Sequence, residues 1–306
     1  MAQFSAKAMA VPALTFSRKL RYGAEAGFFF FLMGLFRLLP LDTASHLGGW
    51  MGRTIFSGLP PDRIARANLK AAFPEKSQDE IEGILLGMWD NLGRTVAEYP
   101  HLEKFVLDGI DPRLKLIGSE HIDAGLAEGK GVMFVSAHLA NWEMMPITAE
   151  QYGIEGATVV RHPNNPYVAR WLERQRGLKG AKDQIGKHSG ARRILAQLKA
   201  GKAIYILVDQ NNDEGIAVPF FGRNAMTTPI PAALSLKLGS RVLYAQNRRL
   251  GRSARFEVTV TPAPDFSPSG DETADTRLLT EKFTAEVEKM IRAEPSQWLW
   301  IHRRWR

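Results

Sequence analysis

The stretch GVMFVSAHLANWE, residues 131–143, decides the fold that we expect for this chain. Its first seven residues form a short apolar run, and similar runs follow at ATVVR (157–161) and AIYILVD (203–209). A helical pattern, YVARWLERQRG (167–177), separates the second run from the third. Apolar runs separated by helices are typical of buried strands in parallel sheets. The sequence therefore predicts an α/β fold with a largely parallel central sheet flanked by helices.

Further elements are predicted on both sides of this core. Apolar residues at helical spacing predict two helices before it, each ended by a proline, and one long amphipathic helix after it. Two more runs predict strands, and a segment rich in Ser, Gly and Asp predicts a surface loop. In chain order these ranges are 64–74 and 79–100 (helices), 241–249 and 255–264 (strands), 267–276 (loop) and 276–295 (helix).

Residues 26–41, AGFFFFLMGLFRLLPL, form the one long apolar run. As a helix, 16 residues would reach about 24 Å, against about 30 Å for the hydrocarbon core of a bilayer. Basic residues at 18, 19 and 21 precede the run, as expected of a cytoplasmic flank. We expect a membrane-anchoring helix within an N-terminal segment 1–45, which either spans the bilayer or lies in its interface. The alternatives are a buried core helix and, less favoured because Arg37 interrupts the run, a signal peptide.

Composition narrows the chemistry. The chain has 306 residues and no cysteine, which excludes disulfides, a thiolate nucleophile and a Cys-based zinc site. It contains no H-E-x-x-H, G-x-S-x-G, Walker A or G-x-G-x-x-G pattern, so we expect no metal and no cofactor. The formal net charge of +8 indicates a surface that attracts phosphates, anionic lipids, acidic proteins or nucleic acid.

His138 and Glu143 follow the first predicted strand directly, at the end where open α/β sheets usually hold their sites. Five residues on an ideal helix would leave the two side chains about 140° apart. The motif must therefore be bent, with regular helix starting near Pro146, where a first helical turn accepts proline. In such a pair the imidazole can take a proton from an attacking hydroxyl while the carboxylate fixes its tautomer. Taken alone, H-x4-E is more often a surface or packing pair.

Several further blocks occur in a recognisable order along nearly the whole chain. The N-terminal apolar segment and a helix end marked by Asn68-Leu69 and Phe73-Pro74 belong to the same pattern. With these features the sequence resembles the late acyltransferases of bacterial lipid A biosynthesis, within the lysophospholipid acyltransferase superfamily. The remaining blocks are NLGRTVAEY (91–99), GSEHI (118–122), GKGVMFVSAHLANWE (129–143), VVRHPNNP (159–166), VDQNNDEGIAVPFFGRNAMTTP (208–229) and QWLWIHRRWR (297–306).

The resemblance implies a function for the motif. In that family the histidine and the carboxylate of H-x4-[DE] act as base and orienter, which maps onto His138 and Glu143. Residues 46–306 would then form an acyltransferase domain that moves a fatty acyl chain from acyl carrier protein to a hydroxyl of a lipid A precursor. The expected location is the bacterial inner membrane with the catalytic domain facing the cytoplasm. Acyl chain length, acceptor hydroxyl and oligomeric state stay open.

Other positions gain a substrate-binding interpretation from the same resemblance. An arginine among Arg161, Arg174 and Arg176 would grip a phosphate or help to build the site, although each is as readily a solvated charge. Asp209 ends a predicted strand, and it would position a substrate or an arginine, or simply cap the next turn.

The tail, residues 297–306, and one apolar stretch are further candidates for substrate binding. Arg303 and Arg304 stand among tryptophans, a composition that suits lipid headgroups or glycolipid phosphates. The stretch 218–222, VPFFG, would line an acyl-chain pocket, unless it is core.

Two rival functions stay open on the sequence. A glycerophospholipid or lysophospholipid acyltransferase of the same superfamily would use the same base with another acceptor. A non-catalytic basic protein that binds membranes or nucleic acid would explain the charge and the tail. It would not explain a His-Glu turn behind a buried strand, so we expect no nucleic-acid partner.

Overall fold

The structure of the protein, a computed structural model, describes residues 15–178, 183–186 and 190–305. Most of its strands belong to one sheet of order β1-β9-β8-β2-β5-β3-β4, in which β8, β2, β5, β3 and β4 are mutually parallel. β9 runs antiparallel to β8, and β1 pairs with β9 at the edge. The separate hairpin β6-β7 completes the strands. Their bounds are β1 Leu114–Ile117, β2 Val132–Ser136, β3 Gly156–Val160, β4 Asp183–Gly186, β5 Ala203–Leu207, β6 Ile216–Phe220, β7 Arg223–Thr227, β8 Arg241–Arg249 and β9 Phe256–Pro262.

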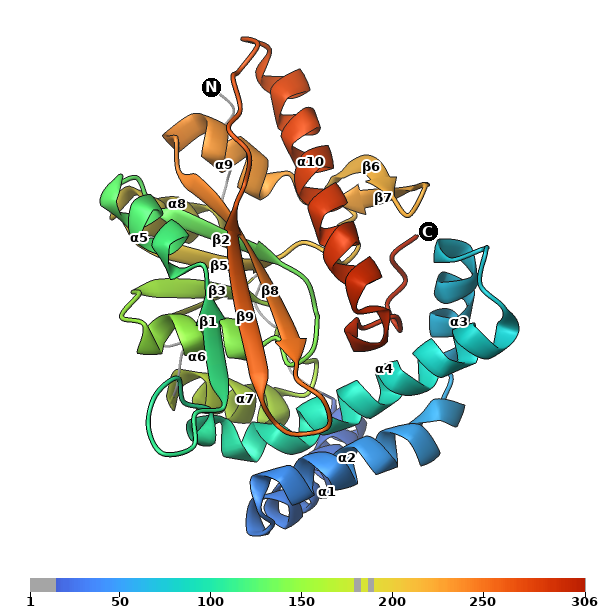
Figure 1. The fold of residues 1–306 in the computed structure, drawn as a ribbon. Coiled ribbons are helices and arrows are strands. Elements are labelled where there is room, and N and C mark those ends of the chain that lie inside the picture. The colour runs from blue at the N-terminus through green and yellow to red at the C-terminus, as the bar shows by residue number, and fades with distance from the viewer. Residues whose placement is uncertain (1–14, 179–182, 187–189, 306) are drawn as a thin grey trace.

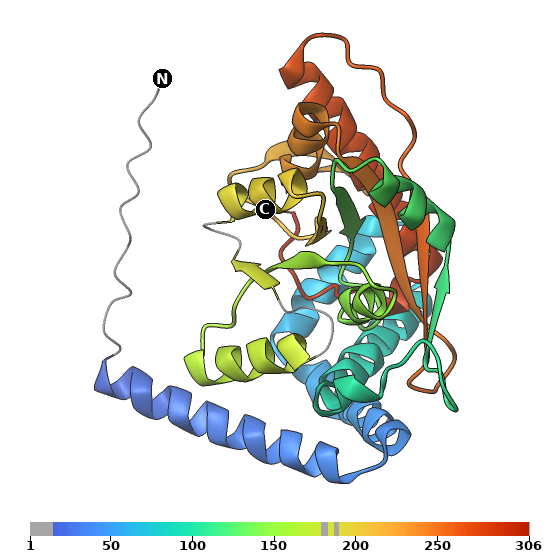
Figure 2. The same cartoon turned by 90° about the vertical axis from the view of Figure 1, so that its left-hand side faces the viewer.

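Helices cover both faces of the sheet (Figure 1). Turned by 90°, the molecule shows α1 extended along one end, beside α7 (Figure 2). The α-helices are α1 Phe16–Leu38, α2 Leu41–Thr54, α3 Pro61–Ala72, α4 Gln78–Glu98, α5 Ser119–Ala127, α6 Met144–Gln151, α7 Pro166–Leu178, α8 Ala191–Lys199, α9 Ile230–Leu238 and α10 Glu272–Ala293. The described residues also form the 3-10 helices η1 Phe56–Gly58, η2 Tyr99–Lys104 and η3 Pro295–Gln297.

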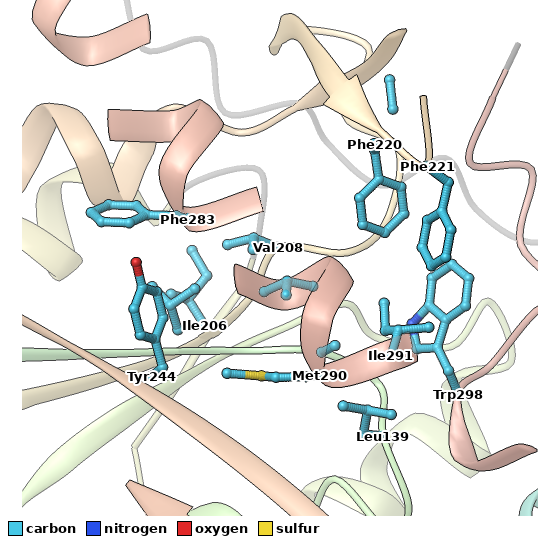
Figure 3. Packing of buried hydrophobic residues seen from close by; sticks show 14 of the residues in the cluster. Leu139, Ile206, Val208, Phe220, Phe221, Tyr244, Phe283, Met290, Ile291 and Trp298 are labelled. Carbon is cyan, nitrogen blue, oxygen red and sulfur yellow. The ribbon is translucent and has the colours of Figure 1, made fainter. Parts of the chain in front are cut away.

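The central strand β2 separates two hydrophobic clusters, because successive side chains of a strand point to opposite faces. Met133 and Val135 belong to the cluster under α8, α9 and α10, whereas Val132 and Phe134 belong to the cluster under α5 and α6. Burial on both faces explains why this strand is apolar throughout. Figure 3 shows the first cluster, in which α10 packs on the sheet through Phe283, Met290 and Ile291.

The predicted α/β class with a largely parallel sheet flanked by helices is confirmed. Five strands were predicted within a few residues of their bounds, as were α3, α4, α7 and α10. The predicted loop 267–276 is shorter than expected, because Asp271 caps α10 and the helix begins at Glu272. The elements that were not predicted are α2, β1, α5, β4, α8, β6, β7 and α9.

The apolar run 26–41 forms the second part of α1 and the first residue of α2, with a break at Leu39 and Pro40. α1 begins earlier, at Phe16, because the Thr15 side chain accepts a hydrogen bond from the Arg18 amide. Its inner face packs on the protein, and its outer face leaves large apolar side chains exposed. No helix among the described residues is both long enough and apolar enough to cross a membrane. Residues 1–14 of the expected anchor segment lie outside the described residues.

Glycines bring α2 very close to α4. A Cβ atom on Gly93 would lie 2.1 Å from the carbonyl oxygen of Gly48, and one on Gly52 would lie 2.0 Å from that of Trp89. Neither position has room for a larger residue without movement of the backbone. This contact fixes α4, whose later turns carry polar side chains toward the loop that follows β2.

Candidate active site

The site forms where two neighbouring parallel strands end. β2 and β5 are paired up to Ser136 and Leu207, and His138 and Asp209 each lie two residues further on. Because both strands point the same way, the two side chains leave the sheet at one edge. The loop from His138 to Glu143 then leads into α6, which begins at Met144 with Pro146 in its first turn. The expected bend in the motif is therefore present.

Asp209 holds His138 by two atoms. Its carboxylate lies 2.9 Å from Nδ1 of the ring and accepts a hydrogen bond of 3.0 Å from the His138 backbone amide. The indole of Trp298 donates a third bond, of 2.7 Å, to the same carboxylate. On the other side of the ring, the side-chain amide of Gln210 lies 3.2 Å from Nε2. This arrangement favours a proton on Nδ1 and leaves Nε2 unprotonated, where it accepts a hydrogen bond from the Gln210 amide.

Asp209 is ionised in this setting. Burial of the side chain favours the neutral acid, but the His138 ring and the three donors outweigh burial and lower the pKa of Asp209 to about 2. A carboxylate that stays charged can orient the imidazole and stabilise the imidazolium that forms when Nε2 takes a proton.

The carboxylate of Glu143 bonds to side chains of α7 and η2, and no hydrogen bond joins it to His138 among the described residues. Arg176 donates to it through Nε, at 2.9 and 3.0 Å, and through Nη2, at 2.7 Å. The hydroxyl of Tyr99 donates a further bond of 2.6 Å. Burial opposes ionisation of Glu143, yet the Arg176 charge and these donors hold its pKa below the ordinary value. Burial and the neighbouring carboxylate raise the pKa of Tyr99, which therefore stays a donor.

A pocket of about 670 Å³ joins these groups, within the usual range for small-molecule sites. His138, Trp142, Glu143 and Arg176 line its polar part. Its other walls are mixed, because the segment after Asp209, residues 210–214, adds amides and the carboxylates of Asp213 and Glu214. The apolar side chains of the lining include Met145, Pro146, Val159, Leu172, Ile194, Leu207, Ile230 and Leu299. The pocket thus combines a histidine base, a paired cation and room for an apolar chain.

The structure separates the predicted arginines. Arg161 is exposed and lines the pocket beside Arg176. Arg174 and Arg303 are also exposed, but they are not among the residues that line it. Arg304 is fully buried and donates to the carbonyl oxygens of Gln210 and Met226 and to the hydroxyl of Thr227. These bonds tie the tail to the segment that follows Asp209.

The larger side chains of the stretch 218–222 and the first two tryptophans of the tail lie in the core. Trp298 and Trp300 are buried and pack against Phe220 and Phe221 at the turn of the β6-β7 hairpin. The expectation that these tryptophans face lipid headgroups is wrong, because the protein's own aromatic side chains surround them. None of residues 218–222 is among those that line the pocket, so the core alternative holds for this stretch.

Two site residues escaped the sequence interpretation. Tyr99, at the end of the NLGRTVAEY block, donates to Glu143, and Trp298, in the tail, donates to Asp209. The blocks were noticed, but spacing alone gave no partner for either side chain. Among the described residues, no group of three or more His, Asp or Glu side chains is placed to hold a metal ion.

An aspartate-held histidine at the open end of parallel strands, beside a partly apolar pocket, defines an enzyme that can activate a hydroxyl group. Residues 13–306 match the family of bacterial lipid A biosynthesis acyltransferases, and the chain belongs to this family. Its class of reaction is therefore acyl transfer in lipid A biosynthesis.

Curated relatives agree with this assignment. The chain is 26% identical over 274 residues to the lipid A biosynthesis lauroyltransferase of Escherichia coli K12, which covers 88% of this chain and 87% of the relative. It is 25% identical over 249 residues to the palmitoleoyltransferase of the same organism, covering 80% and 78%. A phosphatidylinositol mannoside acyltransferase of Mycobacterium tuberculosis is 25% identical over 195 residues, or 61% and 58%.

Proposed function

We propose that His138 activates a hydroxyl of a lipid A precursor for attack on the thioester of an acylated acyl carrier protein. The observation that carries this proposal is the Asp209-held ring of His138, whose unprotonated Nε2 faces a partly apolar pocket. The Gln210 amide, which donates to Nε2, must give way to the acceptor hydroxyl. The names of the relatives support lipid A as the acceptor class. No cofactor is needed for this step, because a thioester is already an activated acyl donor.

The reaction balances with the groups at hand. Nε2 of His138 takes the proton of the acceptor hydroxyl while its oxygen forms a bond to the thioester carbon. The resulting tetrahedral oxyanion collapses, the carbon–sulfur bond breaks, and the proton passes from His138 to the departing thiolate. General-base help of this kind is worth roughly 10² to 10⁴ in rate.

The two carboxylates take different tasks in this proposal. Asp209 fixes the tautomer of His138, the task that the H-x4-E pattern suggested for Glu143. Glu143 holds Arg176 at the pocket wall, where its charge is suited to the oxyanion or to an acceptor phosphate. Arg161, exposed at the same pocket, is a second candidate for phosphate binding. The basic surface as a whole suits an acidic carrier protein.

We also propose that the enzyme works at the cytoplasmic face of the bacterial inner membrane. The outer face of α1 carries exposed apolar side chains along its length, and Arg18, Lys19 and Arg21 stand at its start. This combination is typical of a helix that lies in the interface of an anionic bilayer. The exposed residues on α1 are Phe16, Leu20, Phe28, Phe30, Phe31, Leu35 and Leu38.

The main test is acyl transfer from acyl carrier protein to a tetra-acylated lipid A precursor by wild type and His138→Ala. We expect transfer by wild type and none above background for the variant. His121→Ala is the matched control, because His121 lies on α5, is partly exposed and does not line the pocket.

Parallel assays separate the rival functions. Transfer to a lysophospholipid but not to the lipid A precursor would move the acceptor to the glycerophospholipid class. Transfer from acyl coenzyme A alone would remove acyl carrier protein as donor. If His138→Ala retains full activity, the base assignment is wrong.

Flotation with vesicles tests the membrane proposal separately. Replacing Leu20, Phe28 and Phe31 by serine should release the protein from vesicles that contain phosphatidylglycerol. Leu278→Ser, at an exposed leucine of α10, is the control and should leave binding intact. Equal binding by both proteins would exclude this face of α1 as the contact.

A further inference from the structure

Ala140, in the middle of the His138–Glu143 loop, has a left-handed backbone. Its φ angle is 51°, and its side chain is fully buried. A residue with a Cβ atom adopts this conformation at a cost in free energy, so surrounding contacts must hold it there. The chain bends at Ala140, between His138 and Glu143, so the conformation of this residue helps to set the relative placement of the two side chains.

Two side chains and one backbone carbonyl form a clamp around Ala140. The carbonyl oxygen of Ala140 accepts hydrogen bonds from Asn91 Nδ2, at 3.0 Å, and from Thr95 Oγ1, at 3.2 Å. Its amide donates to the carbonyl oxygen of Gln297, at 2.9 Å, and Asn91 Nδ2 also donates to that oxygen, at 3.2 Å. The clamp, Asn91, Thr95 and Gln297, therefore holds both polar groups of one peptide residue.

A buried ring of charged and amide groups fixes the clamp in turn. Arg249 donates through Nε to Asn91 Oδ1, at 3.0 Å, and through its other nitrogens to Glu98. Glu98 accepts a bond of 2.9 Å from Asn141, whose own oxygen accepts from the Glu143 amide. The ring thus begins behind Ala140 and returns to the motif loop, so Asn91 has little freedom to turn away.

We infer that Asn91 and Thr95 are positioning residues for the acyl-transfer reaction, which hold Ala140 left-handed so that His138 and Glu143 border one pocket. Neither side chain lines the pocket, so both act through the loop. Without the clamp, Ala140 is free to return to a negative φ angle, which L-residues prefer. Such a change would displace His138 relative to the substrate, and a misplacement of about 1 Å can cost roughly a hundredfold in rate.

The test compares Thr95→Val and Asn91→Ala with the same changes in an Ala140→Gly background. Glycine populates positive φ about as readily as negative φ, so it should keep the loop conformation when the clamp is weakened. We expect each single variant to lower kcat roughly ten- to hundredfold with little change in KM. Ala140→Gly should restore most of the lost kcat. Thr284→Val is the control, because it removes a buried hydroxyl on α10 whose bond goes to Thr280.

The inference rests on the proposed function, so a second measurement is independent of activity. The NMR signals of the His138 ring should shift in Thr95→Val and return toward wild type in the glycine background, while Thr284→Val leaves them in place. A wild type that transfers no acyl group would refute the proposed function alone, and the ring signals would still decide the clamp. Loss of thermal stability with unchanged kcat, or no rescue by Ala140→Gly, would overturn the positioning role.

Discussion

Different kinds of partner hold Asp209, which lies behind the ring of His138, and Glu143, which lines the pocket. Asp209 accepts from the backbone and ring of His138 and from the indole of Trp298, so its position follows from the ends of paired strands. Glu143 accepts from Arg176 and Tyr99, so its position follows from where α7 and η2 rest. The site therefore has two halves. The strand half, His138 with Asp209 and Trp298, is suited to proton transfer. The helix half, Glu143 with Arg176 and Tyr99, is suited to holding charge.

The helix half depends on the N-terminal helix as well. Trp171 of α7 packs edge to face on Phe29 of α1, with ring centroids 5.2 Å apart. The same indole lies 6.4 Å from the ring of Tyr99. The helix that we propose to face the membrane is thereby in contact with the helix that carries Arg176. The strand half has no such dependence, because its partners belong to the sheet and the buried tail.

The largest effect is expected for Asp209→Asn, which tests the strand half. The amide keeps the shape but loses the charge that favours a proton on Nδ1 and stabilises the imidazolium. We expect kcat to fall roughly 10² to 10⁴-fold with a small change in KM, measured by steady-state acyl transfer. If Glu143→Gln instead gives this pattern and Asp209→Asn does not, the assignment of the two halves is reversed.

The next largest effect is expected for Glu143→Gln, which tests the helix half. This change leaves the guanidinium of Arg176 without its anionic partner in a largely buried position. Removal of one partner from a buried ion pair typically costs about 3–5 kcal/mol. Urea unfolding should register this loss of stability, and KM should rise because Arg176 is released. An unchanged midpoint of unfolding would contradict a structural role for the pair.

A smaller effect is expected from acid. The pKa of Asp209 is about 2 in the folded protein, below its ordinary value of 3.8. Its stabilising contribution is therefore full above about pH 4 and is lost as the pH falls toward 2. One to two pKa units correspond to roughly 2 kcal/mol. Between pH 5 and about pH 2, the free energy of unfolding should fall less steeply with decreasing pH for Asp209→Asn than for wild type.

The smallest effect is expected for Tyr99→Phe. Loss of one hydroxyl donor leaves Glu143 with the bonds from Arg176, so the pair itself persists. A single hydrogen bond to a charged group is worth about 1.5–3 kcal/mol, and the remaining donors should reduce that loss. We expect a several-fold change in activity, with KM affected more than kcat. A fall in kcat as large as that of Asp209→Asn would place Tyr99 in the proton-transfer half.

Local sequence patterns predicted the sheet and the position of the motif well. The apolar runs at β2, β3 and β5 are buried on the sheet, and burial is what makes such runs visible in a sequence. β4 is short and carries polar residues, and α9 is apolar on most sides, so neither has a distinctive period. The hairpin β6-β7 was not predicted because its turn, Phe221-Gly222, begins with a large apolar residue. Only the positive φ angles of both residues identify it as a turn.

The sequence indicated several residues of the candidate site but not which side chains pair with one another. His138, Glu143, Asp209, Arg161 and Arg176 do line or border one pocket or contact its base. Their partners could not be read from spacing, because Asp209 lies 71 residues from His138 and Arg176 lies 33 residues from Glu143. Proximity in the sequence favoured Glu143 as the partner of His138, whereas the pairing of β2 with β5 brings Asp209 closer.

The contacts of residues 297 and 298 determine when the site can form during translation of the chain. Ala140 bonds to the carbonyl of Gln297, Leu139 pairs with Trp298, and Asp209 accepts from the Trp298 indole. The catalytic loop is translated about 150 residues before these partners, and folding of a nascent chain proceeds from its N-terminal side. A ribosome-bound chain that has not yet released residue 298 lacks these partners of the loop, so we expect the proposed activity only after residue 298 has left the ribosome.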